Sequence, residues 1–208
     1  MSIISASAVK ELREMSGAGM MDCKKALTEA SGNLEDAIDI LRKTGIAKAR
    51  KKSDRSAKEG LVFPYIHPGS KLGVLLEINC ETDFVANTDD FKDLCKDISM
   101  HIAASAPMSV TREEISSDVL DREKAIYADQ ARQSGKPENI IEKMTEGRLN
   151  KFYQENVLVE QSFVKDPDKT VNDLITETVA KLGENIIISR FSRFQLGEKV
   201  NNLAPTDN

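Results

Sequence analysis

The residue types that most often carry covalent chemistry are few in this chain and do not gather in sequence. There are two histidines, His67 and His101, and three cysteines, Cys23, Cys80 and Cys95, with no CxxC pair among them. A metal centre or a histidine-dependent hydrolase needs several such residues close together. The sequence therefore indicates neither. Three cysteines without a disulfide framework predict reduced thiols and a cytoplasmic protein.

Phosphate-binding and nucleophile motifs are also missing from the sequence. No GxxxxGK[ST] loop occurs, and the GAG at Gly17–Gly19 does not complete GxGxxG, because Asp22 stands at the third glycine position. The GxSxG and HExxH motifs are absent as well. Carboxylates are numerous, but helix surfaces are normally rich in them, so no pair stands out as an acid–base couple. We expect a protein that acts by binding and is not an enzyme, with no metal and no cofactor.

The composition narrows the class of protein further. Of the 208 residues, 40% are hydrophobic and 30% are charged, and the formal net charge is −5. This is enough apolar material for one core and a small appended module. The acidic balance gives no general attraction to nucleic acid, and no apolar run approaches the ~20 residues that span a bilayer. We expect no membrane association and no direct binding to nucleic acid.

Residues 1–52 carry the apolar spacing of three short helices. The first ends at Ser16–Gly19, the second begins near Asp22, and the third is capped by Asn33 and closed by Gly45. Three such helices would make a compact binding module. The positions expected to face its interior are Val9, Leu12, Met15, Cys23, Ala26, Leu27, Ala30, Leu34, Ala37, Ile38 and Leu41.

After Gly60 the spacing of the apolar residues changes from one typical of helices to one typical of strands. Strands are expected near residues 61–66 and 72–79, joined by a turn, and a third near residues 186–196. Pro64 places the first of these strands at a sheet edge or at a bulge. The second half of the last strand does not alternate strictly, which predicts a bulge or twist there. Together these strands predict a small antiparallel sheet.

Residues 53–198 as a whole are interpreted as an α+β core. Within it, residues 111–154 look helical and strongly charged, and Pro137 fits the first turn of a second helix there. This pattern predicts an antiparallel helical hairpin that projects from the core. A further helix is expected over residues 171–182, and residues 199–208 are expected to form a flexible tail.

The stretch EINCETDFVANTDDF (Glu77–Phe91) marks a corner between a strand and a helix. Thr88 can cap that helix. The helix would bury Phe91, Leu94, Cys95, Ile98 and Ile102. Phe84 allows two interpretations. It can pack inward while Thr82 or Asp83 caps a turn, which the burial tendency of aromatic residues favours, or it can be held outward to contact another protein.

The motifs of this chain resemble those of a known family. The run VKELREMSGAGMMDCKKALTEASGNLEDAI (Val9–Ile38) closely resembles the opening of bacterial elongation factor Ts, the guanine-nucleotide exchange factor for elongation factor Tu. The similarity continues through EINCETDFVA, resumes in GKPENIIEKMTEGRLNKFYQENVLVEQSFVKDPDKTV and ends in RFSRFQLGE, so it covers nearly the whole chain. One departure is Ser162, where the family pattern has proline, and it concerns local turn geometry.

The resemblance implies a fold, an assembly and a function. The N-terminal helices would resemble a ubiquitin-associated module, followed by an α+β core with a small antiparallel sheet. Short members of the family resemble homodimers that pair these cores, so a dimer is expected. The function implied is binding to elongation factor Tu and release of its GDP during translation elongation.

The resemblance also implies which residues touch the partner. The motif Thr82-Asp83-Phe84-Val85 matches the family's TDFV. Phe84 would insert between helices of the nucleotide domain of elongation factor Tu and disturb the region of the phosphates and the magnesium ion. Asp83 would make polar contacts beside it, while Thr82 and Val85 would set the geometry of the corner.

A second contact is implied for the N-terminal helices, through Lys10, Arg13, Met20 and Met21. The residue types alone leave other interpretations open. The two methionines equally fit a core or the start of a helix, and the two basic residues fit an ordinary solvated surface.

Two other functions compete with nucleotide exchange. The three helices could serve a plain interaction adaptor, which would bind a partner without affecting nucleotide release. The basic segment KARKKSDRSAKEG (Lys48–Gly60) could serve an RNA-binding accessory of translation, although it lacks aromatic residues for stacking on bases. A solvated linker or helix extension is the more ordinary interpretation of that segment.

Overall fold

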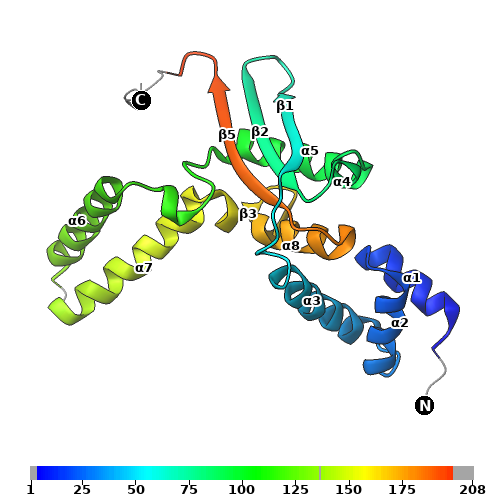
Figure 1. Cartoon of the computed structure of the whole chain (residues 1–208). Coiled ribbons are helices and arrows are strands. Elements are labelled where there is room, and N and C mark those ends of the chain that lie inside the picture. Colours follow the sequence, from blue (N-terminus) through cyan, green and yellow to red (C-terminus); the bar gives the residue numbers. More distant parts are fainter. Residues whose placement is uncertain (1–3, 136, 199–208) are drawn as a thin grey trace.

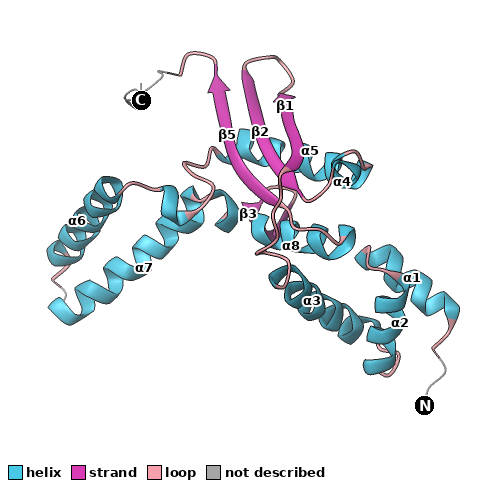
Figure 2. Ribbon diagram, viewed as in Figure 1, coloured by secondary structure: helices cyan, strands magenta, loops and turns pink. Residues whose placement is uncertain are grey.

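The computed structural model describes residues 4–135 and 137–198, and these form an α+β fold, as predicted (Figure 1, Figure 2). The N-terminal helices are α1 (Ala6–Ser16), α2 (Met20–Glu29) and α3 (Leu34–Arg50). The central part contains β1 (Glu59–Ile66), β2 (Leu72–Cys80), α4 (Asp83–Ala86), α5 (Asp89–Ser105), the 3₁₀ turn η1 (Arg112–Glu114), α6 (Ser117–Gln133) and α7 (Glu138–Asn156). The chain continues through η2 (Leu158–Glu160), β3 (Ser162–Phe163), β4 (Asp166–Thr170), α8 (Val171–Leu182) and β5 (Ile187–Gln195).

The main sheet has the order β1-β2-β5, with antiparallel pairing throughout. β1 is an edge strand, which explains how Pro64 is tolerated in it, because proline has no N–H to donate to a neighbouring strand. The pairing of β2 with β5 shifts register between Glu77 and Ile78, opposite Arg190 and Ile188. The irregularity predicted for the last strand is therefore present, but it lies in the first half of β5 and not in the second.

The main core lies between this sheet and the helices α5 and α8. The buried side chains of β2 are Val74, Leu76, Ile78 and Cys80. On α5, all the predicted positions are buried, namely Phe91, Leu94, Cys95, Ile98 and Ile102. Thr88 caps α5, since its hydroxyl accepts a hydrogen bond from the Phe91 N–H at 3.3 Å. Figure 2 shows α5 behind the sheet and α8 beneath the lower end of its strands.

The three N-terminal helices enclose a small cluster of their own around Leu12, Cys23 and Leu27. α2 begins at Met20, close to the start expected near Asp22. The expected end of α3 was wrong, because this helix does not close at Gly45 but runs on to Arg50. Gly45 instead marks a close approach, because a Cβ placed on it would lie 3.4 Å from the Cβ of Ala180 in α8. The missing side chain lets two helices pack closely and does not stop the first of them.

The helices α6 and α7 form the projecting hairpin on one side of the molecule (Figure 1). The helical stretch begins with the short turn η1, and Pro137 stands at the N-cap of α7 and not within its first turn. The base of the hairpin carries a separate apolar cluster around Ile115, Phe152 and Val157. The tail expected at residues 199–208 lies outside the described residues.

Candidate functional site

The chain turns sharply after β2, and Phe84 stands on the outside of that turn. The side chain of Phe84 is 79% exposed, whereas Val85 and Ala86 beside it are buried in the main core. The inward-packing interpretation of Phe84 is therefore wrong. A large exposed aromatic residue that is anchored by a buried neighbour is well placed to contact another protein.

Local hydrogen bonds explain the shape of this segment, which we call the Thr82–Val85 corner. Thr82 is extended, with φ −132° and ψ 151°, and its hydroxyl accepts a hydrogen bond from the Val85 N–H at 3.3 Å. The Thr88 hydroxyl donates to the carbonyl of Val85 at 2.7 Å. Between these two threonines the chain completes a single helical turn. That turn directs Asp83 and Phe84 outward and Val85 inward.

Asp83 shares the exposed side of the corner. Its carbonyl accepts hydrogen bonds from the side chain of Asn87 at 2.9 Å and from the Asn87 N–H at 3.1 Å. Among the described residues, its carboxylate has no hydrogen-bond or ion-pair partner. The carboxylate is thus available to a group outside the chain.

Sequence reasoning missed one residue at the corner. Glu184, in the loop between α8 and β5, accepts hydrogen bonds from Thr82. It lies 102 residues away in sequence, and no motif or spacing relates the two positions.

The N-terminal residues expected to touch a partner are all exposed. Lys10 and Arg13 lie on α1, and Met20 and Met21 form the first turn of α2. The core interpretation of the two methionines is therefore wrong. Met15 was also expected to be buried, but it is exposed at the end of α1 and adds a third methionine to the same end of the N-terminal helices.

The end of α1 lies close to α8, and α8 pairs with α5, the helix that follows the Thr82–Val85 corner. Gly17, just after α1, lies beside α8, since a Cβ placed on it would be 3.7 Å from the Lys181 side chain. Lys181 in turn pairs with Asp90 at 2.6 Å, in the first turn of α5. Figure 1 shows α1, α2 and α4 on the same side of the sheet, opposite the α6–α7 hairpin. The helices that carry the two sets of exposed residues therefore lie on one side of the molecule.

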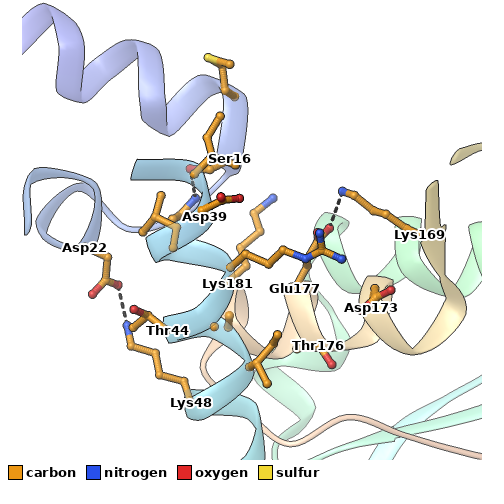
Figure 3. Close-up of a pocket in the computed structure, with 18 residues that line it drawn as sticks. Ser16, Asp22, Asp39, Thr44, Lys48, Lys169, Asp173, Thr176, Glu177 and Lys181 are labelled. Atoms are coloured by element: carbon orange, nitrogen blue, oxygen red, sulfur yellow. Dashed lines mark hydrogen bonds and ion pairs between the residues drawn. The ribbon is translucent and has the colours of Figure 1, made fainter. Parts of the chain in front are cut away.

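A cleft of about 290 Å³ lies between the N-terminal helices and α8 (Figure 3). Lys48 pairs with Asp22 at 2.7 Å on one side of it, and Lys169 pairs with Glu177 at 2.9 Å on the other. Both lysines are therefore paired with carboxylates of the chain itself. The cleft is best described as part of the contact between the N-terminal helices and α8.

In the described part of the chain, no histidine or cysteine side chain is exposed at the corner, although the Cys80 thiol donates a hydrogen bond to the carbonyl of Thr82 at 3.1 Å. His101 is buried, and all three cysteines are buried thiols. Burial raises the pKa of the Cys95 thiol to about 12 and also raises the pKa of Cys80. No group of three or more metal-binding side chains occurs within residues 4–135 and 137–198. In the same described stretches, no helix combines the length and apolar composition needed to cross a membrane.

Comparison with known proteins gives a consistent result. The model of a family described as "Elongation factor TS" matches residues 3–198. A protein of a Thermoanaerobacter species named "Elongation factor Ts" is 59% identical over 198 residues, which cover 95% of this chain and 97% of that protein. Proteins of the same name from Geobacter sulfurreducens and Fervidobacterium nodosum are each 60% identical over 195 residues. That alignment covers 94% of this chain in both cases, and 90% and 99% of the respective relatives.

Proposed function

Because the chain belongs to the elongation factor Ts family, we propose that it binds elongation factor Tu in the cytoplasm and promotes the release of GDP during translation elongation. Such a protein needs no acid, base or nucleophile. It must bind nucleotide-free Tu more tightly than GDP-bound Tu, so that the two ligands weaken each other reciprocally. It acts by binding alone, without covalent chemistry.

The observation that carries this proposal is the outward position of Phe84. Folding normally buries so large an aromatic side chain, yet this one is exposed on a corner that the buried Val85 and the capped α5 hold in place. An aromatic residue on a rigid support loses little conformational entropy when it docks. Phe84 is therefore suited to act as a wedge.

In this mechanism the wedge enters between helices of the nucleotide domain of Tu. A bound guanine nucleotide is held there by backbone N–H groups around its phosphates and by a magnesium ion. Displacing the helices that carry these groups weakens the hold on the nucleotide. Asp83 contributes polar contacts beside the wedge, and Thr82 and Val85 maintain its direction.

The N-terminal helices supply the second contact with Tu. Lys10, Arg13, Met20 and Met21 are the residues assigned to it, and exposed methionines adapt readily to a partner's surface. Residues 1–52 form a module like ubiquitin-associated domains, and residues 53–198 form the core that carries the wedge. A contact at both sites fixes the orientation of the wedge on Tu.

We also propose that the chain forms a homodimer, with a second copy of itself as partner. The outer face of the sheet exposes a row of apolar side chains that no element of the described chain covers. They are Val62, Pro64, Ile66, Leu75, Phe194 and Leu196. Two such faces pressed together would bury each other's apolar area, which is the form that a symmetric dimer interface takes.

Stopped-flow release of fluorescent GDP from elongation factor Tu tests the function. The chain should accelerate release strongly, and Phe84→Ala should reduce the second-order efficiency about 30-fold, the factor for a hot spot of about 2 kcal/mol. Val164→Ala is a matched control, because Val164 is also an exposed apolar residue but lies between β3 and β4, away from the corner. It should leave release unchanged.

The same experiment separates the alternatives. Binding to Tu without faster release by the wild type would support the adaptor and refute the exchange factor. If Phe84→Ala still accelerates GDP release, the exchange function would be supported, and the role of Phe84 as the wedge would be refuted. The RNA-binding alternative has less support, because Lys48, Lys52 and Arg55 of the basic segment already contact Asp22, Gly183 and Glu81 within the chain.

A further inference from the structure

The carboxylate of Glu184 receives three hydrogen bonds from the start of the Thr82–Val85 corner. Its Oε2 accepts from the backbone N–H of Glu81 at 3.1 Å and of Thr82 at 3.0 Å. Its Oε1 accepts from the Thr82 hydroxyl at 2.7 Å. Hydrogen bonds to a charged carboxylate are stronger than hydrogen bonds to an uncharged acceptor. One side chain from a distant loop therefore holds both the backbone and the side chain at the corner.

The Thr82 hydroxyl transmits this hold to the next residues. A hydroxyl has one hydrogen to donate and lone pairs that accept. Thr82 donates its hydrogen to Glu184 and accepts from the Val85 N–H at 3.3 Å. The bond to the carboxylate thus selects the rotamer that caps α4. Asp83 and Phe84 lie between the two residues that are fixed in this way, so their direction follows from them.

The loop that carries Glu184 is itself held from several directions. Gly183 ends α8 with φ +83°, and its carbonyl accepts a hydrogen bond from Lys52. The backbone N–H of Asn185 donates to Glu81 at 2.7 Å, which returns the contact made by Glu184. The Asn185 side chain is buried and donates to the carbonyl of Arg55 at 2.8 Å. These hydrogen bonds hold the loop in place, so the Glu184 carboxylate has a fixed position relative to the corner.

We propose that Glu184 is the positioning residue of the Phe84 wedge. It does not touch the partner; it sets the direction of Phe84 through Thr82. This role rests on the proposed exchange function. Without the carboxylate, the two N–H groups and the hydroxyl would turn to water. The corner would then sample several directions, and only a fraction of molecules would present Phe84 correctly.

The first test measures GDP release from elongation factor Tu with Glu184→Gln, in the wild-type chain and in the chain carrying Phe84→Ala. Glutamine keeps the size of the side chain but removes its charge, and its NH₂ group replaces one of the two oxygens that accept hydrogen bonds from Glu81 and Thr82. With Phe84 present, Glu184→Gln should slow release about tenfold, in line with losing hydrogen bonds to a charged group. With Phe84→Ala it should have no further effect, because there is no wedge left to direct.

Glu177→Gln is the matched control for this substitution. Glu177 lies on α8, the helix that precedes the Glu184 loop, and pairs with Lys169, so the change removes a nearby carboxylate without touching the corner. It should leave release unchanged. An equal slowing by Glu184→Gln in the presence and absence of Phe84 would overturn the proposal, and so would no slowing in either.

A second readout does not depend on Tu. In the free protein, amide hydrogen exchange at Thr82 should become at least about tenfold faster in Glu184→Gln, while the amide of Ile98 in α5 keeps its rate. Thr82→Val serves if Glu184→Gln does not fold; it should slow GDP release in the same way, because it removes the hydroxyl that joins Glu184 to the Val85 N–H. An unchanged exchange rate at Thr82 would overturn the proposal. If the wild type does not accelerate GDP release, the proposed nucleotide-exchange function is refuted. The amide hydrogen-exchange experiment would still show whether Glu184 holds the corner in place.

Discussion

At the scale of single residues, adjacent positions of the corner have different roles: Phe84 is placed to contact a partner, and Val85 stabilises the fold. Phe84 is 79% exposed and Val85 is 7% exposed, although they are adjacent in the chain. Val85→Ala should reduce the free energy of unfolding by about 1–3 kcal/mol, because it removes buried methyl groups and leaves a cavity. Phe84→Ala should change it by less than about 0.5 kcal/mol, as surface substitutions usually do. Urea denaturation of both variants measures the two values, and similar losses would contradict the assigned orientations.

His101 gives the protein a pH-dependent component of its stability. Its Nδ1 accepts a hydrogen bond from the Val164 N–H at 3.2 Å, so its Nε2 must carry the hydrogen and donate to Gln161 at 2.9 Å. Burial lowers the pKa of His101 below its ordinary value of 6.5. A protonated ring would also turn an N–H toward the Val164 N–H. The folded state therefore favours the neutral ring.

The sign of the effect follows from this preference. Below the ordinary pKa the unfolded chain binds a proton at His101 that the folded chain does not bind, so stability falls as the pH drops from about 6.5 toward the lowered pKa of the folded state. Urea denaturation at pH about 7.5 and about 5.5 should show a larger loss for the wild type than for His101→Gln, which cannot titrate. Equal losses in the two proteins would exclude His101 as the cause.

At the scale of elements, replacing glycine by alanine should lower the stability of the protein at one position and raise it at another. Gly60 in β1 has φ +142°, and a Cβ on it would lie 2.2 Å from the carbonyl oxygen of Ile78 in β2. Gly147 is in the interior of α7, and a Cβ there would meet nothing within 4 Å. Gly60→Ala should destabilise the protein by more than about 1 kcal/mol, since β1 would have to move away from β2. Gly147→Ala should stabilise it by about 0.5–1 kcal/mol. Thermal unfolding of both variants checks the two signs, and a stabilising Gly60→Ala would show that β1 does not pair as described.

At the scale of the whole molecule, the outer face of the sheet predicts self-association. Ile66 and Phe194 flank Gly73 of the central strand on that face, and Phe194 is 67% exposed. Sedimentation velocity at micromolar concentration should find a dimer for the wild type. Phe194→Asp should give a monomer, because each copy would place a charge in an apolar interface. Val164→Asp, an exposed position elsewhere, should leave the dimer intact, and a monomeric wild type would refute the assignment.

Several features of this protein were determined by the sequence itself. The apolar run of β2, the helical spacing on α5 and the cap at Thr88 are local patterns, and the structure has the elements that they predict. Pro64 indicated an edge strand or a bulge, because its missing N–H affects only the pairing of its own strand with a neighbour, and β1 is an edge strand. The motifs that indicate the family were also legible without coordinates, and the family match confirms them.

Other features were decided only by the tertiary structure. Gly45 looked like a helix stop, but α8 packs against it and α3 continues, so the meaning of that glycine depended on Ala180 more than one hundred residues away. Met15 has the spacing of a core residue, yet it is exposed among the residues that the structure describes. The hydrogen bonds from Thr82 to Glu184 join positions 102 residues apart. A periodic pattern states which face of an element is apolar, whereas the partner that covers a face or braces a corner is selected by the packing of distant segments. For that reason the location of the corner could be read from the sequence, and the family resemblance implied an outward Phe84, whereas burial tendency alone favoured an inward one. Glu184, the residue that holds the corner, could not be predicted.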